Sequence, residues 1–171
     1  KNIIVIMEAG VRVEQNSVVV VTGASRGIGR AIACEFAEQG ACVVVTARST
    51  SENGPLAGTI YDTARDVEQR GGTAVPVAAD ISRDDDIAGL VRHVMDRCGR
   101  IDVLVNNAAT NRPLPFEQIT MKQWDMILRV NLRGMVACSK AVVPVMKQQH
   151  RGHIINISSV AAHRPGHEPF T

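Results

Sequence analysis

The sequence predicts a doubly wound parallel α/β sheet, because short apolar runs alternate with longer amphipathic ones along the chain. The short runs have the length of strands and hold few polar residues, which is typical of parallel strands covered on both faces. The longer runs repeat their apolar residues at helical spacing. Strand and helix alternating in this way requires parallel strands joined by right-handed crossovers. We therefore expect the strand order 3-2-1-4-5, with a ligand at the carboxyl ends of strands 1 and 4.

The elements follow one another with short connections. Strands are expected at residues 18–21, 43–45, 74–79, 101–105 and 153–157. The first helix carries Ile28, Ile32 and Phe36 on one face, and Gly40 ends it. Capping boxes open the later helices, with the pairs Thr59 and Asp62, Ser82 and Asp85, and Thr120 and Gln123. Pro144 should bend the later half of the last helix.

Composition excludes several classes of protein. The 171 residues fit one domain at 17–171 behind an N-terminal extension at 1–16, and the net charge of +2 comes from scattered basic residues rather than a nucleic-acid-binding stripe. No apolar run reaches the length of a membrane span. The four cysteines form no CxxC pair, so we expect buried free thiols and a cytoplasmic protein. The histidines near the C-terminus lack cysteine or acidic partners at metal spacing, so no metal is expected.

A glycine-rich segment joins the first strand to the first helix, and it reads Thr22-Gly23-Ala24-Ser25-Arg26-Gly27-Ile28-Gly29. Glycines at these positions let the backbone turn sharply and approach a ligand closely. The helix that follows presents free N–H groups and the positive end of its dipole. A glycine trio alone is weak evidence for a ligand site, but its place between a four-valine strand and an amphipathic helix favours a pyrophosphate site.

This segment resembles the T-G-x-x-x-G-x-G fingerprint of classical short-chain dehydrogenases/reductases, a Rossmann-like family. Further motifs follow in the family's order. Asp80-Ile81 stands where family members contact the adenine ring, and Asn106-Asn107-Ala108-Ala109 resembles the family's N-N-A-G, with Ala109 in place of glycine. The stretch at residues 58–64 also resembles a subset related to hydroxysteroid dehydrogenase-like proteins.

The resemblance implies an oxidoreductase that interconverts an alcohol and a ketone by hydride transfer with a nicotinamide cofactor. Asn131 matches the family's active-site asparagine, which kinks a helix and holds a water in the proton relay. It falls on the apolar face of its helix, so we expect it to be buried and hydrogen-bonded. Ser159 matches the family's catalytic serine, which contacts the substrate oxygen. The loop at 110–116 would form one wall of the substrate pocket, and the full-length protein would be a homo-oligomer.

The family's proton-donating tyrosine, with a lysine four residues later, has no counterpart here. The only tyrosine is Tyr61, followed by Arg65, and it lies before the third strand on the wrong side of the sheet order. The family spacing places the catalytic tyrosine just beyond Thr171, so the chain resembles a domain that is incomplete at its C-terminus. We therefore expect the chain as given to be inactive.

The cofactor is expected to be NADP(H) rather than NAD(H). Members specific for NAD carry an acidic residue at the end of strand 2, but here that position holds Ala47. Arg48 follows it, and Arg26 lies in the glycine-rich segment. Guanidinium groups suit bidentate contacts to a phosphate, so both arginines would bind the 2′-phosphate. Glu52 in the next loop would weaken this preference if it approached the ribose.

Three alternatives stay open. An extended family member would carry T-G-x-x-G-x-x-G, a spacing that Gly27 and Gly29 do not match. A non-catalytic nucleotide-binding module and an incomplete polypeptide are both compatible with the motifs. The substrate and the reaction direction do not follow from the sequence.

Overall fold

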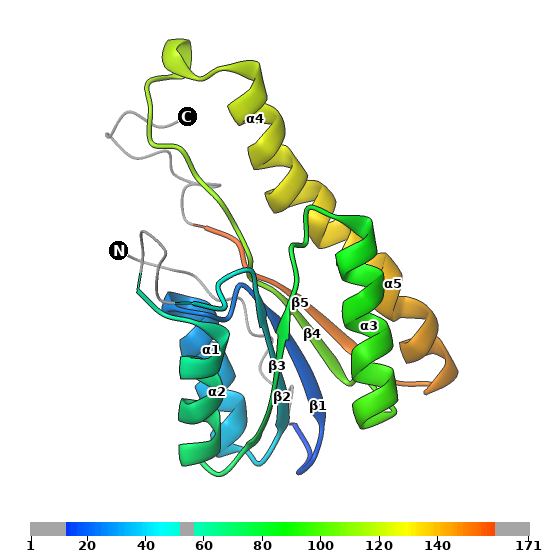
Figure 1. The fold of residues 1–171 in the computed structure, drawn as a ribbon. Coiled ribbons are helices and arrows are strands. Elements are labelled where there is room, and N and C mark those ends of the chain that lie inside the picture. Colours follow the sequence, from blue (N-terminus) through cyan, green and yellow to red (C-terminus); the bar gives the residue numbers. More distant parts are fainter. Residues whose placement is uncertain (1–12, 52–56, 160–171) are drawn as a thin grey trace.

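The computed structural model describes residues 13–51 and 57–159. Strands and helices alternate along them as predicted (Figure 1). Their order is β1 (Val18–Thr22), α1 (Gly27–Glu38), β2 (Cys42–Ala47), α2 (Ile60–Gln69), β3 (Thr73–Ala78), α3 (Asp84–Cys98), β4 (Val103–Asn106), α4 (Met121–Leu128), α5 (Met135–Gln148) and β5 (His153–Asn156). A short 3₁₀ turn, Phe116–Gln118, precedes α4, and a π-helical turn, Arg129–Gly134, joins α4 to α5.

The strands form one parallel sheet in the order β3-β2-β1-β4-β5, which confirms the predicted topology. The central strand β1 pairs with β2 from Val18 opposite Cys42 to Thr22 opposite Thr46. On its other side it pairs with β4. The chain crosses from one half of the sheet to the other after β3, so the carboxyl ends of β1 and β4 lie at the topological switch point.

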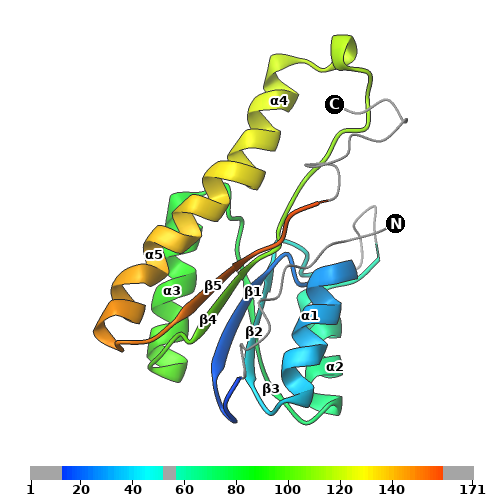
Figure 2. The same ribbon diagram turned by 180° about the vertical axis from the view of Figure 1, so that it is seen from behind.

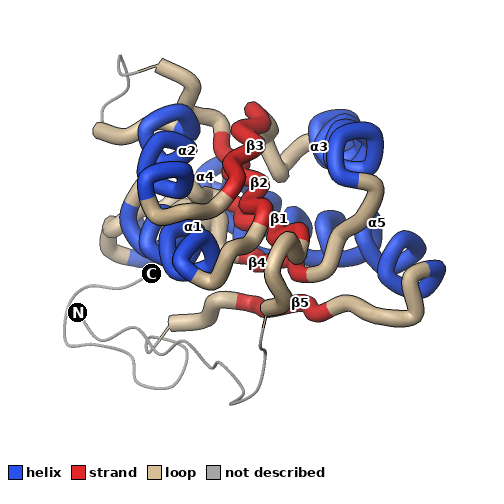
Figure 3. Tube along the Cα trace, turned by 90° about the horizontal axis from the view of Figure 1, so that it is seen from below, coloured by secondary structure: helices blue, strands red, loops and turns tan. Residues whose placement is uncertain are grey.

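Helices cover both faces of the sheet (Figure 3). α1 and α2 lie on one face, and α3 and α5 lie on the other. The valine run of β1 explains this arrangement, because successive side chains of a strand point to opposite faces. Val19 and Val21 join the core beneath α1 and α2, whereas Val18 and Val20 join the core beneath α3 and α5. α4 extends past the carboxyl edge of the sheet, as the view from behind shows (Figure 2).

Two of the three predicted capping boxes are confirmed. The Thr59 hydroxyl accepts a hydrogen bond from the Asp62 N–H at the start of α2, and Thr120 does the same for Gln123 at the start of α4. The box predicted at Ser82 is wrong, since α3 begins after Arg83 without a side-chain cap. Competition explains this difference: the Ser82 N–H donates to the Asp80 carboxylate, which forms a tight turn before the helix.

The long helix predicted after Thr120 is divided by the π-helical turn, and α5 then continues through Pro144. The irregular turn therefore lies before the proline that was expected to bend the helix. Several apolar side chains of this region are exposed, namely Phe116, Met121, Met126, Leu128, Leu132 and Val136. The homo-oligomer in which a second copy would cover them stays a prediction.

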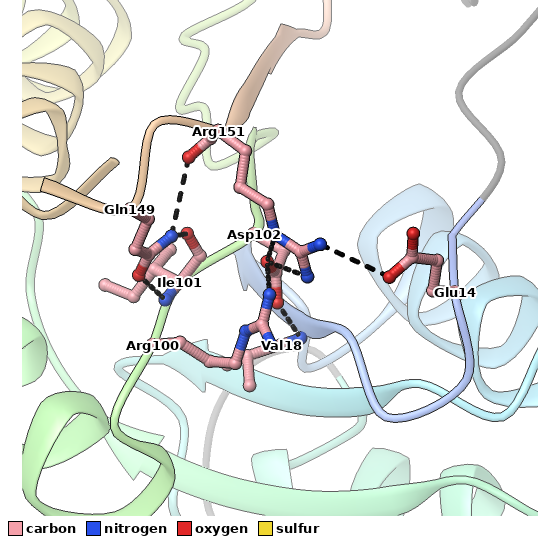
Figure 4. Close-up of polar contacts among 7 residues, drawn as sticks. All are labelled: Glu14, Val18, Arg100, Ile101, Asp102, Gln149 and Arg151. Carbon is pink, nitrogen blue, oxygen red and sulfur yellow. Dashed lines mark hydrogen bonds and ion pairs between the residues drawn. The ribbon is translucent and has the colours of Figure 1, made fainter. Parts of the chain in front are cut away.

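A buried carboxylate ties the strands together at the amino edge of the sheet (Figure 4). Asp102 lies just before β4, and its Oδ2 accepts a hydrogen bond of 2.8 Å from the backbone N–H of Val18. Its Oδ1 receives the guanidinium groups of Arg100 at 2.6 Å and Arg151 at 3.1 Å. The backbone of Asp102 also bonds to Val18 and His153. One residue thus connects β1, β4 and the start of β5 at the edge opposite the glycine-rich segment.

No helix in the described part of the chain is long and apolar enough to cross a membrane. Among residues 13–51 and 57–159, no group of three metal-ligating side chains comes together. His163 and His167 lie outside the described residues. All four cysteines are free, but only Cys34 and Cys138 are buried, so the expectation of buried thiols is confirmed for two of the four.

Candidate functional site

The glycine-rich segment forms a tight turn at the carboxyl end of β1. Gly23 and Gly27 have φ angles of +65° and +56°, a left-handed conformation that residues with a Cβ rarely adopt. A Cβ on Gly23 would lie 2.7 Å from the Cα of Ala108, so this turn packs directly against the segment after β4. The sequence placed both Gly23 and Ala108 in a cofactor site, and the structure brings them together.

The amino end of α1 is open to an anion. Among the described residues no side chain caps this helix, and its first turn, which contains Gly27, Ile28 and Gly29, has no acidic residue. The buried Gly29 allows the first turn of the helix to lie against the backbone of Gly23. Free N–H groups and the positive end of the helix dipole therefore lie at the carboxyl edge of the sheet, at the switch point. This arrangement suits a pyrophosphate.

Hydrogen bonds of Thr22 and Asn107 link the glycine turn after β1 to the segment after β4. The Thr22 hydroxyl accepts hydrogen bonds from the backbone N–H groups of Asn107 at 3.0 Å and Ala108 at 3.1 Å. The Asn107 side chain donates to the carbonyls of Thr22 at 2.9 Å and Gly23 at 3.2 Å. Asn107 was predicted to bind the cofactor, but its observed contacts support the glycine turn. Ala109, the next predicted residue, is exposed beside it.

A second support reaches the turn from α2. The Thr63 hydroxyl donates to the carbonyl of Ala24 at 2.8 Å, and both residues are buried. Gly58 also lies against the turn, since a Cβ there would be 2.5 Å from the carbonyl oxygen of Ser25. Sequence reasoning missed Thr63, although its place one turn after the capping residue Thr59 was available as a signal.

Two arginines lie at the carboxyl edge of the sheet, Arg26 just before α1 and Arg48 just after β2. The Nη2 of Arg26 donates to the Ser49 hydroxyl at 2.8 Å, and its Nη1 is buried without a hydrogen-bond partner among the described residues. The side chain of Arg48 is 67% exposed and lies 3.9 Å from the Asp80 carboxylate. Arg26 thus offers an unsatisfied cationic donor, and Arg48 is held only by a long, exposed ion pair.

The predicted adenine contacts Asp80 and Ile81 follow β3. Asp80 is fixed by its backbone, whose N–H donates to the Asp86 carboxylate at 2.9 Å. The Ile81 side chain is buried in the core beneath α3 and α5 and packs against Gly134 of the π-helical turn. Only the backbone of Ile81 can therefore face a ligand.

Asn131 lies in the π-helical turn and is exposed, so the prediction of a buried asparagine is wrong. Its expected hydrogen bonds are nevertheless present. The Asn131 Oδ1 accepts from the Thr110 N–H at 2.8 Å, and its Nδ2 donates to the Thr110 carbonyl at 2.9 Å. These two bonds hold the start of the loop at 110–116 against the π-helical turn. π-helical turns are frequent at functional sites because they reorient side chains and backbone carbonyls.

The same turn is tied to α3. Arg133 donates to the Asp84 carboxylate, and this hydrogen bond lowers the pKa of Asp84. Both side chains are more than half exposed, so the pair orients the turn without adding much stability.

Polar side chains also gather where β4 and β5 end. The Asn106 Nδ2 donates to the Asn156 Oδ1 at 2.8 Å and to the Ser139 hydroxyl at 3.1 Å. Ser139 in turn donates to the Met135 carbonyl. This network fixes the end of β5, from which Ser159 follows in an exposed position. Sequence reasoning quoted Asn106 only as part of a motif and gave no role to Ser139 or Asn156.

Tyr61 is half exposed in the first turn of α2. α2 lies on the same face of the sheet as α1 (Figure 1). Asn131 and Ser159 follow elements on the other half of the sheet, beyond β4. The structure therefore agrees with the exclusion of Tyr61 as the catalytic tyrosine. Arg65 pairs with Asp62 on the same helix.

Comparison with known proteins identifies the family. A family model described as short chain dehydrogenase matches residues 17–169, so the chain belongs to the short-chain dehydrogenase family. Curated relatives include hydroxysteroid dehydrogenase-like protein 2 of Mus musculus, 41% identical over 82% of this chain and 29% of that protein. The Xenopus laevis protein of that name is 39% identical over 81% of this chain and 33% of its own length.

Solved structures agree with this assignment. A short-chain dehydrogenase/reductase from Burkholderia xenovorans superposes with a TM-score of 0.83 at 35% identity, covering 91% of this chain and 61% of that chain. A metagenomic short-chain oxidoreductase in complex with NADP has a TM-score of 0.80 at 40% identity, covering 89% of this chain and 66% of that chain. The chain thus spans about a third of its curated relatives and about two thirds of these solved structures.

Proposed function

We propose that the chain is the NADP(H)-binding part of an oxidoreductase that interconverts an alcohol and a ketone. One observation carries the cofactor assignment: an open helix end lies behind a glycine turn at the switch point of the sheet. The residues present fit the group, because a Cβ on Gly27 would meet no described atom within 4 Å and Arg26 has a buried donor without a partner among the described residues. When bound, NADP(H) would supply the hydride chemistry.

The chain's own residues would orient the cofactor and the substrate. Gly23, Ser25, Gly27, Ile28 and Gly29 would bind the pyrophosphate through their backbone. Asp80 and the backbone of Ile81 would border the adenine ring, and Ala108 with Ala109 would line the nicotinamide side. These assignments are supported by the place of each residue at the carboxyl edge of the sheet.

Two residues would act on the substrate side. Ser159 would donate a hydrogen bond to the substrate oxygen, since it follows β5 at the carboxyl edge next to the crevice. Asn131 would position the π-helical turn, whose reoriented carbonyls can hold a water for proton transfer. The bonds from Asn131 to Thr110 support this role, because they fix the turn against the wall of the substrate pocket.

The preference for NADP(H) over NAD(H) is tested by Arg48→Ala. We expect NADPH binding to weaken by about tenfold, because each charge-assisted bond to the 2′-phosphate contributes roughly 1.5–3 kcal/mol. NADH binding should change little, since NADH lacks that phosphate. Arg26→Ala should act in the same direction. Titration of each variant with both cofactors at one ionic strength measures the effect.

A matched control is Arg92→Ala, which removes an exposed arginine from α3 and should leave both affinities unchanged. Equal losses for NADPH and NADH in Arg48→Ala would contradict the assignment of this arginine. Tighter binding of NADH than NADPH by the unaltered chain would contradict the cofactor preference itself.

The 171-residue polypeptide by itself should not reduce carbonyl substrates with NADPH. Its single tyrosine lies on α2, and no Tyr–Lys pair stands near Ser159 in the sequence. General acid–base assistance contributes roughly 10²–10⁴-fold to such reactions. NADPH absorbance followed with a panel of ketones and aldehydes measures this. NADPH binding without turnover is the expected result, and steady turnover by the polypeptide would contradict the prediction.

A further inference from the structure

Two cysteines from distant parts of the sequence meet at the amino edge of the sheet. The Sγ atoms of Cys42 and Cys98 lie 3.9 Å apart, although the residues are 56 positions apart in the chain. Cys42 is the first residue of β2, and Cys98 is the last residue of α3. Both are half-buried at the border of the core beneath α3 and α5, so a small oxidant can reach them.

We propose that Cys42 and Cys98 form a reversible disulfide when the folded chain meets hydrogen peroxide. A disulfide needs its sulfurs about 2.05 Å apart, so the two side chains must approach further. The end of α3 can allow this approach, because Cys98 is the last residue of the helix and is followed by Gly99, where a Cβ would meet no described atom within 4 Å. Cys42, by contrast, is held in the sheet between Val18 and Thr73.

The reaction balances with peroxide as the oxidant. The thiolate of one of the two cysteines attacks one peroxide oxygen and becomes a sulfenic acid, and the second oxygen leaves as water. The sulfur of the other cysteine then attacks the sulfenic sulfur, the S–S bond forms and the hydroxyl group leaves as a second water. Two thiols have been oxidised and one peroxide reduced, and a dithiol reductant reverses the result.

The 3.9 Å separation of the two sulfurs favours the second step, because the remaining thiol is already beside the oxidised one. Burial, followed by the neighbouring Cys98, raises the pKa of the Cys42 thiol to about 11. Peroxide reacts with thiolates, so a raised thiol pKa slows the oxidation near neutral pH.

The other two cysteines lack such a partner within hydrogen-bonding distance in the described structure. Burial raises the pKa of Cys138 to about 11, and Cys34 is likewise buried and its pKa raised. They provide internal controls. If exposure alone governed the oxidation, Cys34 and Cys138 would stay reduced, and Cys42 and Cys98 would be oxidised without being linked to each other.

The bridge would join β2 to α3 and leave the cofactor crevice unchanged. Cys42 opens β2 at the amino edge, whereas Arg48 follows β2 at the carboxyl edge. The loop that the bridge would close contains β2, α2, β3 and α3. Closing so long a loop restricts the unfolded chain, so the oxidised form should melt roughly 5–10 °C higher than the reduced form.

The test treats the folded chain with hydrogen peroxide, alkylates the remaining thiols and maps a non-reducing digest by mass spectrometry. We expect one linked peptide pair, Cys42 with Cys98, that dithiothreitol reverses and that Cys34→Ala and Cys138→Ala still form. The melting temperature should rise on oxidation in those controls and stay constant in Cys42→Ala and Cys98→Ala.

The single variants separate the steps. Neither Cys42→Ala nor Cys98→Ala should form the link, and dimedone should trap a sulfenic acid on the remaining cysteine of at least one of the two variants. Circular dichroism of each reduced variant checks that it is folded. Peroxide that leaves both thiols free, oxidises Cys98 irreversibly without a link, or joins a different pair would overturn the proposal.

Discussion

Gly29→Ala should destabilise the chain by about 3 kcal/mol, because a buried backbone contact has no room for a methyl group. A Cβ at this position would lie 2.4 Å from the carbonyl oxygen of Gly23 and 2.5 Å from the Asn107 Nδ2. Relief of either contact moves the glycine turn away from α1 or breaks the bonds from Asn107 to Thr22 and Gly23. Urea denaturation measures the loss, and NADPH affinity should fall at least about tenfold because the pyrophosphate site is displaced.

Gly89→Ala is the matched control. Gly89 lies inside α3, and a Cβ there would meet only the end of the Arg92 side chain at 3.9 Å. The same substitution should therefore stabilise the chain by about 0.5–1 kcal/mol, since alanine is the better helix former. If Gly29→Ala proved as harmless as Gly89→Ala, the close packing of the glycine turn against α1 would be wrong.

The topology could be predicted because few folds satisfy the sequence pattern. A strand of four valines must be covered on both faces, and alternation with amphipathic helices then leaves the parallel, doubly wound sheet. The strand bounds differ from the predicted ones by a few residues, because the ends of hydrogen-bonded strand pairs depend on tertiary contacts. The glycine turn was equally predictable, because its left-handed residues require glycine.

The parts that were mispredicted depend on contacts that the spacing of residues within a helix does not reveal. Ser82 matched a capping motif, but Asp80 competed for its N–H. Asn131 shares a helix face with apolar residues, which predicted burial, but Leu128, Leu132 and Val136 of that face are exposed in this chain as well. Local spacing identifies an apolar face and carries no information on what covers it. The partners of Asn106 lie on α5 and β5, so its network could not be found before the fold was known.

The second large effect is expected at the amino edge, where Asp102→Ala should cost about 3 kcal/mol of folding stability. The substitution leaves the buried N–H of Val18 without its acceptor and the guanidinium groups of Arg100 and Arg151 without their carboxylate (Figure 4). The side chains of both arginines are partly exposed, at 39% and 44%, so water compensates some of the lost pairing. This places the effect at the lower end of the range for broken buried ion pairs. Urea denaturation near neutral pH measures it.

Asp102→Asn separates the two contributions. Asparagine keeps an oxygen that can accept from the Val18 N–H, but its amide group donates toward the arginines instead of accepting from them. The loss of folding stability should therefore be smaller for Asp102→Asn than for Asp102→Ala. Added salt should reduce the difference in stability between Asp102→Asn and the unaltered chain, because salt screens the arginine pairs. Asp96→Ala, at an exposed position of α3, should change stability by no more than about 0.5 kcal/mol. Equal stability of Asp102→Ala and Asp96→Ala would mean that this buried carboxylate does not hold β1, β4 and β5 together.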